Sequence, residues 1–185
     1  IPANVETIGD GAFANTKLVT VTFAERTKPL TLGTLENSDQ KNGVFYNTKI
    51  VEITFGDRVT LIGAYAFYNQ TTLTTATMNP DSQVTQIGKY AFAVESGTSK
   101  LKTLTLGGKL ETIYDHAFFK SKVSKITIPK TVALIDGYAF ANTGMSGLIF
   151  EQGGIVELTI GTQAFASSTF AEVTLPARLQ SAYYL

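Results

Sequence analysis

Side chains that could perform acid–base, nucleophilic or metal chemistry are sparse in this sequence. His116 is the only histidine and there is no cysteine, which excludes thiolate nucleophiles, disulfides and sulfur-ligated metals. The fifteen acidic residues are dispersed and contain no Asp-x-Asp-x-Asp-Gly pattern for a divalent cation. Nothing in the sequence ties a serine or a carboxylate to His116 as a catalytic triad requires. We therefore expect no catalytic site, no cofactor and no metal.

A set of threonines suggests recognition rather than catalysis. They recur at one place in a series of alternating segments, with Ile149 in the remaining copy; the set is Thr22, Thr54, Thr77, Thr105, Thr127 and Thr174. Aligned on a sheet, they would form a flat ladder of hydroxyls for an extended partner or a glycan. A structural explanation is also open, because threonine is β-branched, suits a solvated strand and pairs laterally with itself.

Aromatic side chains with a polar edge form a second candidate set. They lie two residues before a recurring phenylalanine; the set is Tyr65, Tyr90, His116 and Tyr138. Aligned rings could bind sugars or proline-rich peptides, and packing between neighbouring coils explains them equally well. His116 stands where three sibling copies carry tyrosine, which argues against a catalytic histidine.

An internal repeat positions both sets. An Ala-Phe pair, Val-Phe in one copy, recurs seven times at separations of 32, 22, 25, 26, 22 and 25 residues; its phenylalanines are Phe13, Phe45, Phe67, Phe92, Phe118, Phe140 and Phe165. A period of this length fits one coil of a solenoid and is too short for a βαβ unit with a full helix. Stacked coils would align the phenylalanines in one column through the core.

Alternating segments follow most of these phenylalanines by about five residues and predict strands. The segments are 18–23, 50–55, 73–78, 101–106, 123–128, 145–150 and 170–175. Their first, fourth and sixth residues are apolar, or alanine in one case, and are predicted to face the core. Their third and fifth residues are then predicted to face solvent.

The remaining part of each coil has its own pattern. An isoleucine at Ile8, Ile62, Ile87, Ile135 or Ile160 precedes a turn-forming residue and predicts a second, short strand. The Ala-Phe segment is compatible with a short helical or 3₁₀ turn on the opposite wall. The predicted fold is a repeat solenoid of the leucine-rich-repeat type, mainly β or α/β, with about seven coils of 22–32 residues. Each coil holds a strand of a parallel sheet.

Composition excludes several classes of partner. Fifteen basic and fifteen acidic residues cancel, so no long-range positive field attracts nucleic acid, and we expect binding to depend weakly on salt. No apolar run is long enough to span a membrane, and the first residues lack a signal-peptide pattern. We expect no nucleic-acid partner and no membrane insertion of this segment.

The order Ile-Pro, Val, Ile-Gly, Ala-Phe, Asn, Leu, Val, Phe resembles the BspA-like class of leucine-rich repeats. The resemblance covers essentially the whole chain and is clearest between Ile128 and Phe150. It implies a bacterial cell-surface or secreted protein, since several members of that class are implicated in adhesion to host matrix or to other cells. The function it implies is a non-catalytic module that binds a protein, another cell or a glycan outside the cell. The alternative is a spacer that carries another domain and has no ligand of its own.

The boundaries of the chain lead to two further expectations. Residues 1–185 read as a single leucine-rich-repeat domain that is a fragment of a longer chain, because Ile1 begins within a unit. Tyr183, Tyr184 and Leu185 would leave apolar surface at the C-terminus, so end-to-end self-association is expected. The polar insertion from Thr34 to Gly43 is either a binding loop or a disordered decoration.

Overall fold

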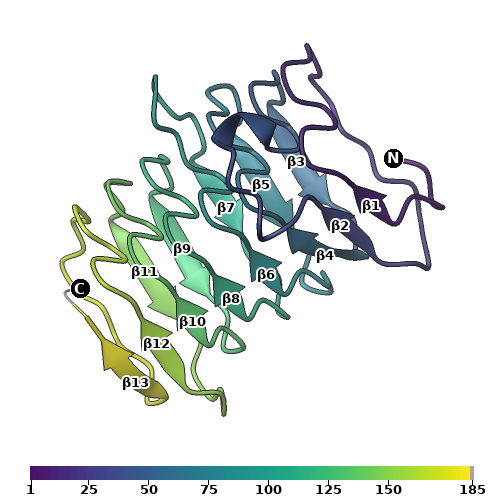
Figure 1. Ribbon diagram of the computed structural model, residues 1–185. Coiled ribbons are helices and arrows are strands. Elements are labelled where there is room, and N and C mark those ends of the chain that lie inside the picture. Colours follow the sequence, from purple (N-terminus) through teal and green to yellow (C-terminus); the bar gives the residue numbers. More distant parts are fainter. Residues whose placement is uncertain (184–185) are drawn as a thin grey trace.

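A computed structural model describes residues 1–183 as a stack of parallel coils (Figure 1). The coils follow one another in sequence order from the purple N-terminal end to the yellow C-terminal end. Tyr184 and Leu185 lie outside the described residues, so the apolar C-terminal surface is represented only by Tyr183, which is 54% exposed.

One wall of the stack is an unbroken parallel sheet of eight short strands. In spatial order these are β1 (Thr7–Ile8), β2 (Leu30–Leu32), β4 (Val59–Ile62), β6 (Gln86–Ile87), β8 (Thr112–Ile113), β10 (Leu134–Ile135), β12 (Leu158–Ile160) and β13 (Leu179–Ala182). The isoleucines of the repeat point inward: Ile62, Ile87 and Ile113 are fully buried and lie in register. Each strand between β1 and β13 pairs with the strands on both sides of it.

The threonine-bearing segments form a second wall, here called the threonine wall. It contains a three-stranded sheet and a two-stranded sheet, whose strands are β3 (Glu52–Phe55), β5 (Thr75–Met78) and β7 (Thr103–Thr105), then β9 (Lys125–Ile128) and β11 (Gly147–Phe150). The predicted facing is confirmed in these five coils. In β3, for example, Ile53 and Phe55 are buried while Glu52 and Thr54 are exposed.

Two of the seven predicted strands on this wall are wrong. Segments 18–23 and 170–175 form no ladder, and Leu175 is 42% exposed although its position predicts a core residue. Each segment belongs to a terminal coil, where only isolated backbone bonds join it to a neighbour. Lys49 N donates to Leu18 O at 2.8 Å, and Thr169 N donates to Met145 O at 2.7 Å. On the other side of the first segment, Ile1 N donates to Thr22 O and Ala24 N donates to Ile1 O. These isolated bonds do not form the continuous register of a strand ladder.

The short strands predicted at the isoleucines form the more extensive of the two sheet walls. The short isoleucine strands form the continuous sheet, whereas the threonine wall is interrupted between β7 and β9. Lys122 N still donates to Leu101 O at 3.0 Å there, so the two coils remain neighbours where the segments begin. The strand spacing of about 4.8 Å is therefore kept along the isoleucine wall, and the threonine wall opens locally.

The Ala-Phe segments are hydrogen-bonded turns, not helical or 3₁₀ turns. The residues two before and two after the phenylalanine adopt left-handed backbone in most copies, as at Tyr65 (φ 56°) and Asn69 (φ 57°). A left-handed residue interrupts a right-handed helix, which prevents the helical turn. These turns also bond from coil to coil, because Tyr65 N donates to Lys89 O and Phe67 N to Ala91 O. They form the third wall, here called the turn wall.

The predicted phenylalanine column is confirmed. Successive rings from Phe13 to Phe165 are stacked at centroid distances of 5.4, 4.9, 5.0, 5.1, 4.9 and 5.4 Å. Phe118 is completely buried between Phe92 and Phe140, with interplanar angles of 4° and 5°. The glycine four residues before the repeat phenylalanine allows this approach, since a Cβ at Gly88 would lie 2.4 Å from the backbone nitrogen of Ala64.

The polar insertion from Thr34 to Gly43 is ordered. It contains the 3₁₀ helix η1 (Gln40–Asn42), which Asp39 caps by accepting a hydrogen bond from Lys41 N. Asn37 is buried, and its amide donates to Asn42 O at 3.0 Å. The structure therefore favours a built loop over a disordered decoration.

We predict that Phe118→Ala lowers the free energy of unfolding by about 3 to 5 kcal/mol, because it removes a buried ring from the middle of the column and leaves a cavity. Urea unfolding of the purified chain measures the loss. Phe119→Ala is the matched control, since Phe119 is adjacent and only partly buried. Equal losses in the two variants would contradict a special role for the column.

Candidate functional site

The four aromatic residues singled out in the sequence form one stacked column on the turn wall. Ring centroids are separated by 5.3 Å between Tyr65 and Tyr90, 4.6 Å between Tyr90 and His116, and 4.8 Å between His116 and Tyr138. All four side chains are partly exposed. Because the rings cover one another's faces, a partner meets their edges and hydroxyls, with free faces only at the ends of the column. The stack is therefore not a platform for sugar rings.

The backbone beneath this column is unusual. Tyr65, Tyr90, His116 and Tyr138 have φ values of 56°, 54°, 56° and 55°. Glycine adopts this region freely, and Gly11 does so in the first copy, whereas a side chain costs about 1 kcal/mol or more. Stacking contributes about 0.5 to 1.5 kcal/mol per pair of rings and offsets that cost.

Burial and nearby negative charges both favour the protonated form of the tyrosine hydroxyls. Burial raises the pKa of Tyr65 and of Tyr90, and the negative charges of Asp115 and Glu95 raise both further. The ammonium of Lys89 lies 5.8 Å from the ring centroid of Tyr65. The exposed edge of the column thus offers neutral phenols that can donate or accept hydrogen bonds.

His116 has a carboxylate partner that the sequence analysis did not expect. Its Nδ1 lies 2.8 Å from Oδ2 of Asp115, the preceding residue. The ring is held between Tyr90 and Tyr138, and no side-chain hydrogen bond reaches its Nε2 within residues 1–183. A nucleophile at that nitrogen would be needed for a triad. The pair orients the ring within the column.

Tyr68 and Glu95 are contacts that the sequence analysis missed. The Tyr68 hydroxyl donates to Oε2 of Glu95, and its ring meets the rings of Tyr65 and Tyr90 edge-on at 5.4 and 6.2 Å. Burial raises the pKa of Tyr68, and the bond to Glu95 raises it further. The backbone nitrogen of Glu95 donates to the side chain of Asn69 at 2.8 Å, so this loop is fixed to the preceding coil. The only sequence signal is an aromatic residue directly after the repeat phenylalanine.

The threonine column lies on a different wall from the aromatic column, so the two predicted sets do not converge on one site. Thr54 pairs with Thr77 and Thr77 with Thr105, and Thr127 pairs with Ile149. No strand pairing joins Thr105 to Thr127 or Thr22 to Thr54 in the part of the chain that the structure describes. All members are exposed except Thr77, which is partly buried; Ile149 is 62% exposed. The column therefore has two paired sections, Thr54 to Thr105 and Thr127 to Ile149, and Thr22 and Thr174 at its ends are unpaired with either within the described residues.

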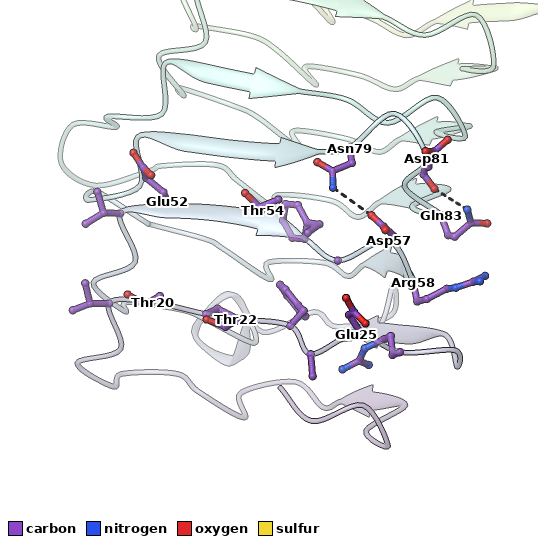
Figure 2. A pocket seen from close by; sticks show the side chains of 18 residues that line it. Thr20, Thr22, Glu25, Glu52, Thr54, Asp57, Arg58, Asn79, Asp81 and Gln83 are labelled. Carbon is purple, nitrogen blue, oxygen red and sulfur yellow. Dashed lines mark hydrogen bonds between the residues drawn. The ribbon is translucent and has the colours of Figure 1, made fainter.

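A groove of about 1020 Å³ lies at the first of these interruptions (Figure 2). Thr20 and Thr22 of the first coil lie on one side of it, and Glu52 and Thr54 of β3 on the other. Charged and amide side chains gather where the strands end: Glu25, Asp57, Arg58, Asn79, Asp81 and Gln83. The amide of Asn79 donates to Asp57 Oδ1 at 3.3 Å. Sequence reasoning missed this groove because it depends on the missing ladder.

A second, smaller groove of about 380 Å³ lies at the interruption between β7 and β9. Thr105 and Thr127 lie on its two sides, together with Lys125 and Ile149. Both grooves are open, and their walls carry hydroxyls, charges and a few apolar side chains. Such surfaces suit extended partners better than small ligands, which bind mainly in enclosed apolar pockets.

Within residues 1–183 no group of three or more His, Asp or Glu side chains is arranged to hold a metal ion. Over the same range, none of the helices is long and apolar enough to cross a membrane.

Comparison with known proteins identifies the repeat. A family model described as the BspA type leucine-rich repeat region matches residues 1–96 and 38–169, with six copies. Among curated proteins, none matches this chain.

Two solved structures are similar. A leucine-rich cell surface protein from Faecalibacterium prausnitzii A2-165 aligns with 98% of this chain at 22% identity and a TM-score of 0.60. A leucine-rich repeat protein from Bacteroides ovatus ATCC 8483 aligns with 98% of this chain and 67% of its own length, at 15% identity and a TM-score of 0.37. The first has the same fold, and this chain spans 42% of its length.

An alanine variant is usually more stable than the glycine variant at the same position, and we predict the opposite order of stability at Tyr90. Tyr90→Ala loses three ring contacts and keeps a side chain on the left-handed backbone, whereas Tyr90→Gly loses the same contacts and removes the backbone strain. The glycine variant should be more stable by about 1 kcal/mol in urea unfolding. At Tyr114, which has no left-handed φ, glycine should be the less stable variant. The same order at both positions would refute the backbone explanation.

Proposed function

Because the chain belongs to the BspA-type leucine-rich repeat family, we propose that it is a non-catalytic binding module at the cell surface or in a secreted protein. Its partner is a host protein, another cell or a glycan, engaged through the outer side chains of the coils. Adhesion is the activity that such a module performs.

The observation that carries this proposal is the exposed threonine column. In β3, for example, Ile53 and Phe55 on either side of Thr54 are buried in the core, whereas Thr54 faces solvent. Strand pairing holds Thr54, Thr77 and Thr105 beside one another across three coils. Solenoids use such extended regular surfaces to bind partners.

Three further observations support the proposal. The grooves at the breaks of the threonine wall give an extended ligand polar and apolar contacts. The Faecalibacterium structure with the same fold is that of a cell surface protein, which supports an extracellular location. His116 is the only histidine and is enclosed by two tyrosines, which supports a function without catalysis.

A spacer function is the alternative, and a specific feature favours it. The unbroken eight-stranded sheet and the phenylalanine column run through the whole stack, so the module is a stiff rod. A spacer would lie between an anchor and a distinct terminal domain, whereas an adhesin would be outermost in the full-length protein. We propose that 1–185 forms one leucine-rich-repeat domain within such a longer chain, and that its ends can associate with further copies.

The proposal predicts specific binding of the purified chain to at least one member of an array of matrix proteins and glycans. A variant with Tyr65→Phe, Tyr90→Phe and Tyr138→Phe tests the aromatic column, because it keeps the stacked rings and removes the exposed hydroxyls. If the column takes part, this variant should bind at least about tenfold more weakly, since each hydroxyl contributes about 0.5 to 1.5 kcal/mol. An unchanged affinity would leave the threonine wall as the binding surface, and no binding to any member would favour the spacer.

A further inference from the structure

The charges of this chain cancel overall but are segregated along the stack. Residues 97–130 contain seven lysines and two acidic residues, Glu111 and Asp115, a local excess of five positive charges. The coils on both sides carry the compensating acidic residues. The neutrality of the whole chain therefore hides a basic region on two adjacent coils.

Five of these lysines form one surface, here called the lysine patch. They lie at or just before the start of two neighbouring segments of the threonine wall; the patch is Lys100, Lys102, Lys120, Lys122 and Lys125. All five are exposed. The bond from Lys122 N to Leu101 O places the two coils side by side, with Lys100 and Lys122 at equivalent positions. Lys125 is the first residue of β9 and lines the smaller groove. Lys100, Lys102 and Lys122 precede β7 and β9, and Lys120 lies in the preceding turn.

The acidic side chains near the patch are engaged elsewhere. Glu95 accepts a hydrogen bond from Tyr68, and Asp115 is paired with His116. Glu111 immediately precedes β8 and belongs to the isoleucine wall. Within residues 1–183, none of the five ammonium groups forms a hydrogen bond or ion pair with a protein atom; Lys120 lies over the ring of Phe119 at 5.1 Å.

The fold does not require these lysines. The position of Lys100 and Lys122 carries lysine in two other coils, Lys17 and Lys49, but Thr72, Gly144 or Thr169 in the remaining three. The position of Lys102 carries Thr74 in the preceding coil, and that of Lys125 carries Thr103. Like charges within a Debye length of about 10 Å repel one another and disfavour the compact state. A cluster that opposes stability and has no partner within the chain indicates a partner outside it.

We propose that the lysine patch binds a linear acidic polysaccharide. This inference rests on the proposed binding function and names its ligand class. The lysine ammonium is a point charge on a flexible chain, whereas the planar guanidinium of arginine binds one oriented carboxylate with two hydrogen bonds. Lysines therefore suit repeated anionic groups better than a single oriented carboxylate. The hydroxyls of Thr103, Ser124 and Thr127 lie among the lysines and can bond sugar hydroxyls. The cores of protein interfaces are depleted in charged residues, which disfavours a folded protein on this surface.

The surroundings of the patch also disfavour nucleic acid. On one side of the patch, Glu52 lies two strands from Thr103, through the pairs Glu52–Thr75 and Thr75–Thr103. On the other side, Glu172 occupies the position equivalent to Lys125 in the segment two coils away. A duplex carries one charge per about 1.7 Å and would place phosphates against these acids. Single strands bind by stacking bases on open aromatic faces, and the rings of this chain cover one another.

The test measures binding of the purified chain to polygalacturonate and dextran sulfate, with neutral dextran, duplex DNA and anionic phosphatidylserine vesicles as comparators. The patch variant is Lys100→Gln, Lys102→Gln and Lys122→Gln. The matched control is Lys17→Gln, Lys41→Gln and Lys130→Gln, which removes the same charge from exposed lysines outside the patch. Thermal unfolding at low salt is recorded for all three proteins.

We expect the chain to bind the acidic polysaccharides and not neutral dextran, with affinity falling between roughly 50 and 200 mM salt. The patch variant should bind about tenfold more weakly, and the control within about twofold of the parent. The patch variant should melt no lower than the parent, because removing repulsion does not weaken the fold. The affinity should therefore depend more strongly on salt than the neutral net charge predicts, because the lysine patch is a local region of positive charge.

Several outcomes would overturn the inference. These are equal losses in patch and control variants, equal affinity for neutral dextran, and tighter binding to DNA or to vesicles than to polysaccharide. If the array reveals a ligand whose binding is unaffected by the patch variant, the inference fails while the proposed binding function stands. If no ligand of any kind binds, both fail and the spacer function is favoured.

Discussion

The repeat distance between coils is the constraint on which the rest of the structure depends. Parallel strands in a sheet lie about 4.8 Å apart, and the phenylalanine rings follow at 4.9 to 5.4 Å. One coil cannot bury its own edges, so hydrogen bonding and ring stacking must be satisfied at the same spacing. Positions on the isoleucine wall and the turn wall are then held beside their equivalents, and the aromatic column from Tyr65 to Tyr138 follows from that spacing.

The sequence predicts the core of this fold well because burial leaves a periodic pattern. The inward positions of β3 and β9, and the column through Phe118, follow from apolar spacing alone. The hydrogen-bond partner of a strand leaves no such pattern, which explains why the terminal segments 18–23 and 170–175 were wrongly predicted as strands. The same limitation hides which of the two walls is continuous.

The turn wall could have been predicted more closely. Gly11 stands where later copies carry Tyr65 or His116, and asparagine follows the phenylalanine at Asn15 and Asn69. Glycine and asparagine are the residues that tolerate left-handed backbone, so both positions signal it. The grooves, the pairing of Tyr68 with Glu95 and the placement of the two candidate columns on separate walls needed coordinates. Each depends on contacts between coils rather than on spacing within one.

The repeat separates positions that the fold requires from positions that it leaves free, and recognition must use the latter. The column of Phe118 is fixed in every coil, and the faces of Tyr90 and His116 are occupied by their neighbours. What varies from coil to coil is the outer layer: Lys102 stands where another coil carries Thr74, Lys125 where another carries Glu52, and Ile149 stands among threonines. Departures from the repeat are therefore the features that distinguish one face of this solenoid from a uniform rod, and the lysine patch is the largest local departure in charge.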